Sequence, residues 1–160
     1  YNWGATLFGL ARRLRASASG AEADEAALQG AEVFVRALDA AGGQAVIPYT
    51  AALPLLESSI RSANPEMARR ALRLAARAAE VAPAPADFFT LAVAHALAGE
   101  ADQSRRLLAD LARRDERSEW LDPLLADPLV GEDLKRYAAE LAASVPQKKH
   151  RAASKRPSKR

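Results

Sequence analysis

Residues 88–111 read FFTLAVAHALAGEADQSRRLLADL. Apolar residues recur at three- and four-residue steps on both sides of Gly99, and this spacing is typical of amphipathic helices. Because glycine commonly ends a helix, the pattern predicts one helix over residues 88–98 and a second over residues 102–114. Only a few residues link the two segments, so we expect an antiparallel helical hairpin.

The same apolar spacing extends over most of the chain. It predicts further helices over residues 1–17, 22–41, 51–63, 66–81 and 132–143. Thr50 and Asp87 are candidate N-caps, and Pro54 is expected in a first helical turn, where its missing N–H costs little. The 160 residues include 39 Ala and 21 Leu but only 9 Val plus Ile, which favours helix over strand. The predicted fold class is therefore all-α.

Small residues recur in a 34-residue register in the middle of the chain. With Phe88 at position 4, positions 8, 15 and 20 are small, and with Leu55 at position 4 of the preceding unit, 33 residues earlier, positions 20 and 27 are small and position 32 is proline. The residues concerned are Ala92, Gly99, Ser104, Ala71, Ala78 and Pro83. This pattern resembles the tetratricopeptide repeat (TPR), whose unit has this length. At the start, Trp3-Gly4 and Leu7 resemble positions 7, 8 and 11 of an interrupted unit.

The resemblance implies antiparallel helix hairpins stacked as a short TPR-like solenoid over residues 1–118, followed by a C-terminal capping helix pair. Trp120 is expected in that cap, with a binding motif as the alternative. A generic helical bundle or a related helix-hairpin solenoid stays open as well. We predict a repeat domain over residues 1–145 and a tail over residues 146–160. Because the sequence opens at Tyr1 within a helical pattern, we expect this domain to be the C-terminal part of a longer chain.

The resemblance also implies a concave face that binds peptides. The family's inner positions 5 and 9 are Leu56 and Ile60 in one unit and Phe89 and Val93 in the next. Since all four are apolar, the expected partner is an amphipathic or apolar segment of another protein. The Lys, Asn and Arg set that clamps a peptide carboxylate in some TPR proteins is absent at these positions. The alternative is that upstream sequence of the same polypeptide packs there.

The positive charge is concentrated in the tail. Its seven basic residues are Lys148, Lys149, Arg151, Lys155, Arg156, Lys159 and Arg160, with no acid among them. Residues 1–145 hold the other 16 basic residues and all 20 acidic ones, a net charge of −4. The tail is predicted to be disordered when unbound and to contact phosphates of a nucleic acid, or an acidic protein, without sequence specificity. A merely solubilising tail is the alternative.

Little in the sequence indicates catalysis. Cysteine is absent, and the two histidines, His95 and His150, lack a metal-ligand spacing. His95 is expected to be a partly buried structural residue. No phosphate-binding loop or nucleophile motif occurs. We therefore expect a non-enzymatic, cytoplasmic protein with no cofactor, no metal and no transmembrane segment.

Overall fold

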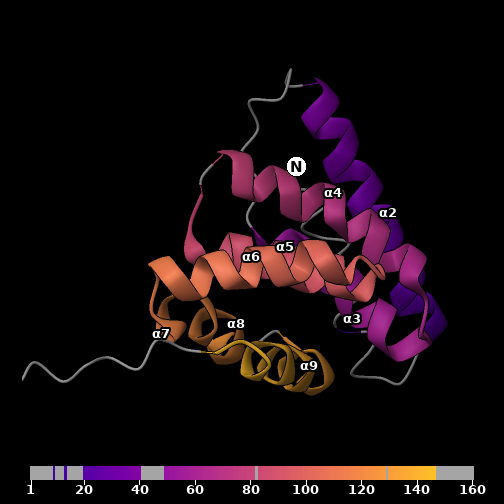
Figure 1. Ribbon diagram of the computed structural model, residues 1–160. Coiled ribbons are helices and arrows are strands. Elements are labelled where there is room, and N and C mark those ends of the chain that lie inside the picture. Colours follow the sequence, from indigo (N-terminus) through magenta and orange to yellow (C-terminus); the bar gives the residue numbers. More distant parts are fainter. Residues whose placement is uncertain are drawn as a thin grey trace, which may run out of the picture.

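The structure is a computed structural model of the 160-residue chain, and it describes residues 9, 13, 20–40, 49–81, 83–128 and 130–146. These residues form eight α-helices and one short 3-10 helix, with no β-strand among them. The predicted all-α class is therefore confirmed (Figure 1). The helix predicted over residues 1–17 and the basic residues of the tail lie outside the described residues, apart from Gly9 and Arg13.

Most predicted helix boundaries agree with the structure to within three residues. The elements in chain order are α2 (Gly20–Ala40), η1 (Tyr49–Ala51), α3 (Leu53–Ser62), α4 (Pro65–Val81), α5 (Pro85–Leu97), α6 (Ala101–Arg114), α7 (Arg117–Trp120), α8 (Asp122–Ala126) and α9 (Glu132–Ala143). The prediction for residues 132–143 matches α9 at both ends.

The two predicted N-caps need correction. Thr50 lies in η1, and the N-cap of α3 is Ala52, which makes no side-chain cap. Pro54 does lie in the first turn of α3, as predicted. Helix α5 begins at Pro85, which places Asp87 at the third helical position instead of the cap. There its carboxylate accepts a hydrogen bond of 3.0 Å from the Ala84 N–H, the acidic half of a capping box.

The predicted helix stops have clear backbone causes. Helix α5 ends before Gly99, whose φ of +86° is the left-handed conformation that glycine adopts without strain. The break after α3 also uses a left-handed residue, Ala63, with φ of 49°. Asn64 then accepts a hydrogen bond from the Glu66 N–H at 3.0 Å through its side-chain oxygen. This contact supports the first turn of α4 after the Asn64-Pro65 break.

Helices α3 to α6 pack in sequence order, each against the next, and α3 also contacts α5. Helix α2 packs against both α3 and α4 (Figure 1). Small residues are buried at these contacts, among them Ala71, Ala78, Ala92 and Ser104. Because small side chains let helix backbones approach closely, the alanine-rich composition is used for helix–helix packing.

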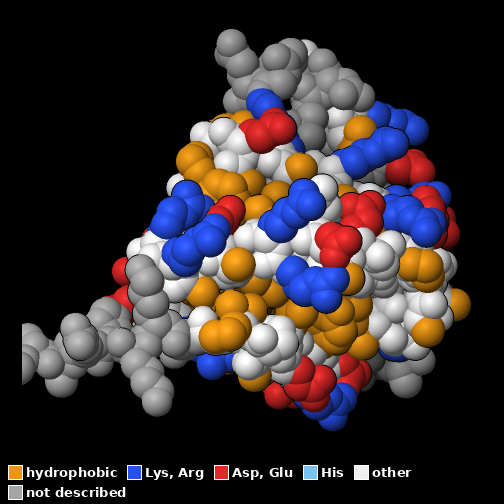
Figure 2. All heavy atoms as spheres, in the orientation of Figure 1, with side chains coloured by type: hydrophobic (Ala, Val, Ile, Leu, Met, Phe, Trp, Pro, Cys, Tyr) orange, Lys and Arg blue, Asp and Glu red, His pale blue; other side chains and the backbone are white. Residues whose placement is uncertain are grey.

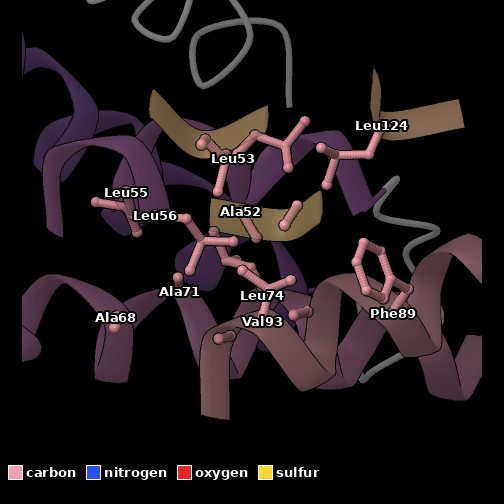
Figure 3. Packing of buried hydrophobic residues seen from close by; sticks show 14 of the residues in the cluster. Ala52, Leu53, Leu55, Leu56, Ala68, Ala71, Leu74, Phe89, Val93 and Leu124 are labelled. Atoms are coloured by element: carbon pink, nitrogen blue, oxygen red, sulfur yellow. The ribbon is translucent and has the colours of Figure 1, made fainter. Parts of the chain in front are cut away.

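The C-terminal helices pack against α3 and α5. Helix α9 contacts α3, and α7 contacts α5. The ring centroids of Trp120 and Phe89 lie 4.9 Å apart, and the Gly131 N–H donates a 2.7 Å hydrogen bond to a Glu57 carboxylate oxygen. Figure 3 shows Leu124 of α8 in the same apolar cluster as Phe89. Trp120 is therefore a buried core residue that joins this segment to α5.

Candidate functional site

The four predicted groove residues belong to the core or its edge in this structure. Leu56, Phe89 and Val93 are each 0% exposed. Ile60 is half-buried and packs against the same cluster. Figure 3 shows Leu56 and Val93 pointing toward Leu74 of α4. A partner could reach these three buried side chains only if neighbouring helices moved away, so they do not line an open groove here.

The reason for this burial is tertiary. Leu56 and Val93 belong to α3 and α5, which pack against α4, and the C-terminal helices also contact α3 and α5. Trp120 covers Phe89 directly. The sequence-level expectation placed these C-terminal helices at the open end of a stack. The seven predicted tail contacts, from Lys148 to Arg160, lie outside the described residues.

A different concave surface lies between α2 and α4. It is a half-open groove of about 520 Å³, here called the α2–α4 groove. Its lining residues are Leu28, Ala31, Glu32, Val35, Arg36, Glu66, Arg69, Arg70 and Arg73. In Figure 2, basic side chains gather next to acidic ones over the part of this face where α2 and α4 lie. The groove thus combines apolar and charged groups.

Helical periodicity explains why these residues face one another. On α2, Leu28, Ala31 and Val35 recur at three- and four-residue steps, which places them on one side of the helix. On α4, Arg69, Arg70 and Arg73 follow the same steps from Glu66, while the core-facing residues of α4 occupy the opposite side. The arginines therefore edge an apolar strip that α2 supplies.

Ion pairs inside the groove neutralise only part of its positive charge. Glu66 lies 3.2 Å from Arg69 and 3.7 Å from Arg70, and Glu32 lies 3.8 Å from Arg36. Arg73 has no ion pair with any described residue. Among the described lining residues, four guanidinium groups thus share two carboxylates, which gives this set a formal charge of +2. All the paired side chains are about half exposed or more, so these ion pairs are individually weak.

Sequence analysis missed this groove, although half of its signal was visible. The arginine spacing on α4 can be read from the sequence as one charged face. What the sequence does not show is that α2 lies beside that face, since residues 28 and 73 are far apart in the chain. The floor of the groove exists only when the two helices pack together.

The other notable polar groups lie away from the groove. His95 at the end of α5 is within 2.7 Å of Glu100, a contact that spans the turn between α5 and α6. Its side chain is only one-fifth exposed, as expected for a packing residue. On α6, the hydrogen bond from Arg105 lowers the pKa of Asp102, and burial raises the pKa of Tyr137 on α9. None of these residues lines the groove.

Within the described part of the chain, no group of three or more His, Cys, Asp or Glu side chains is placed to hold a metal ion. Among the described helices, none has the length and apolar character needed to cross a bilayer. Comparisons with known proteins found no matching family model, no matching curated protein and no matching solved structure. The functional argument therefore depends on the groove itself.

Proposed function

We propose that this protein is a non-catalytic interaction scaffold that binds a segment of a partner protein in the α2–α4 groove. The observation that carries the proposal is an apolar floor, formed by one helix, next to a row of arginines on a second helix. Helical segments of partner proteins commonly bind in such grooves through their apolar side. Polar groups at the rim then set orientation and specificity.

The surrounding packing supports a preformed site. Helix α4 contacts α2, α3 and α5, so the arginine row stands on a helix held from several sides. Leu28 and Val35 are half-buried, and each keeps apolar surface that a ligand can cover. A site on packed helices loses little conformational entropy when it binds.

The finer architecture is part of the proposal. We infer that α3–α4 and α5–α6 are two TPR-like hairpins. Their support is the packing of each helix on the next and the burial of Ala71, Ala78, Ala92 and Ser104 at the small positions of the 34-residue register. On this view the C-terminal helices occupy the surface that peptide ligands would use in such repeats, and a ligand binds at the α2–α4 groove instead.

The test of this proposal is a selection from a displayed library of helical peptides, followed by mapping of the bound peptides by NMR chemical-shift changes. We expect the shifts to concentrate on the backbone amides of the groove residues. Leu28→Asp should weaken binding of the selected peptides, because it introduces a charge into the apolar floor. Leu107→Asp on α6 is the matched control, since Leu107 is also half-buried but does not line the groove.

Circular dichroism should show equal helix content in both variants. Peptides that map to another surface, or a Leu107→Asp variant that loses as much binding as Leu28→Asp, would reject the groove as the binding site. Retained binding in Leu28→Asp would reject it too.

A second candidate function is association with nucleic acid through the tail. The observation in its favour is the run of seven Lys and Arg residues within residues 146–160, against a net charge of −4 in the rest of the chain. Such a tail can neutralise phosphates, and it has no aromatic residue for stacking on bases. This function is compatible with the scaffold proposal, because it uses a different part of the chain.

A further inference from the structure

The α2–α4 groove has more hydrogen-bond donors than its own acids can use. A guanidinium group carries five N–H donors and no acceptor. Glu66 is shared between Arg69 and Arg70, its contact with Arg70 is 3.7 Å long, and Arg73 is unpaired among the described residues. These arginines can therefore donate hydrogen bonds to the carboxylates of a ligand without first breaking a strong contact.

Charge disfavours the two terminal segments of this chain, and a second copy of it, as occupants of the groove. Residues 1–17 contain Arg12, Arg13 and Arg15 and no acid, and the tail is also purely basic. Either segment would bring positive charge to a groove that is already positive. A second copy that used the same groove in a symmetric contact would place arginine against arginine. Each of these arrangements is disfavoured by like-charge repulsion.

The apolar floor narrows the choice among negatively charged partners. Leu28, Ala31 and Val35 form a strip along one side of α2, and none of the described residues that line the groove is aromatic. Nucleic-acid bases are usually held by stacking on aromatic rings, so this strip suits them poorly. It suits the apolar side of a helix, whose neighbouring acidic residues would then face α4.

We infer that the partner segment is an acidic amphipathic helix. Its apolar residues cover the strip on α2, and its Asp or Glu side chains pair with Arg70 and Arg73. The inference depends on the proposed function, because it names the class of ligand for the same groove. The groove volume of about 520 Å³ lies within the range of ordinary ligand pockets and suits a few anchoring side chains.

The test uses the full chain and three labelled synthetic peptides in a fluorescence-anisotropy assay. The first peptide is an amphipathic helix with leucines at i, i+3, i+4 and i+7 and glutamates on both flanks. The second has lysine in place of every glutamate. The third keeps the glutamates and has serine in place of every leucine. We expect the first peptide to bind at least about tenfold more tightly than either of the others.

Two protein variants locate the charge effect. Arg73→Glu should weaken binding of the acidic peptide by about tenfold, because it replaces an attraction at the groove with a repulsion. Arg106→Glu on α6 changes the net charge of the protein equally, but Arg106 does not line the groove. It should change the affinity by less than about twofold. This pair separates a contact in the groove from long-range attraction, including any attraction by the tail.

The outcomes that overturn the inference also show whether the proposed function survives. Equal binding of the acidic and basic peptides, both weakened by Leu28→Asp, would mean that the groove binds an apolar segment of either charge. If the acidic peptide that lacks leucine bound as tightly as the acidic peptide with leucines, the protein would be binding polyanions in general. A single-stranded oligonucleotide that displaces the acidic peptide, and whose own affinity depends on Arg73, would favour nucleic acid as the occupant. The proposed function itself is rejected by the outcomes given above for the library selection, among them the absence of any ligand that maps to the groove.

Discussion

Phe89 illustrates how one residue can satisfy two different predictions. An apolar residue at an inner repeat position is expected either to line a groove or to pack in a core. In this structure Phe89 is 0% exposed and lies against Trp120, so it acts as a core residue. The difference matters experimentally, because core and groove residues respond to truncation in different ways.

We predict that Phe89→Ala lowers the free energy of unfolding by roughly 3–5 kcal/mol, since it removes a fully buried ring and leaves a cavity beside Trp120. Urea denaturation followed by circular dichroism measures this change. Leu28→Ala is the control, and we expect it to cost less than Phe89→Ala because Leu28 is only half-buried. Equal effects of the two substitutions would show that Phe89 does not have the core role described above.

At the scale of single elements, helix limits follow from short-range chemistry. The signals are local. Helices α3 and α5 each have a proline in the first turn and a left-handed residue after the last turn, and α5 has an acid at its third position. Because signals of this kind act over a few residues, both limits of α9 were predicted correctly, and the other predicted limits mostly agree with the structure within three residues. The cap assignments were less accurate because the N-caps of α3 and α5 are Ala52 and Ala84, which have no polar side chain to mark the position in the sequence.

We predict that Asp87→Ala destabilises the protein by about 1 kcal/mol, because the Ala84 N–H loses its 3.0 Å acceptor at the start of α5. Asp87→Asn keeps an acceptor oxygen at the same place and should recover much of the loss. Thermal unfolding of both variants provides the measurement. A stability for Asp87→Ala equal to that of the unmodified protein would contradict the capping role.

At the scale of the whole molecule, the contacts of the C-terminal helices matter most. The sequence predicted a cap for the end of a helical stack. In the structure α7 packs on α5, and α9 packs on α3, and Trp120 covers Phe89, one of the residues expected to line a groove. A surface that looks free when helices are considered one at a time is thus part of the interior of the folded chain.

Charge is also divided at this scale. The tail carries all of the chain's excess positive charge, whereas residues 1–145 are net acidic. We predict that removal of residues 147–160 abolishes salt-sensitive retention on an anionic nucleic acid. With up to seven phosphate contacts on duplex DNA, the slope of log K against log salt concentration should be no steeper than about −6. An unchanged slope after truncation would exclude the tail as the contact.

The sequence by itself determined the all-α class, most helix limits and the strongly uneven charge, because these depend on residue composition and on contacts between near neighbours in the chain. The tertiary structure alone decided that Leu56, Phe89 and Val93 are core residues, and that Leu28 and Val35 form the floor of a groove with arginines at its edge. Burial and concavity arise where segments distant in the chain pack together. A local pattern shows which side of a helix is apolar, but the neighbouring helices decide whether that side is covered.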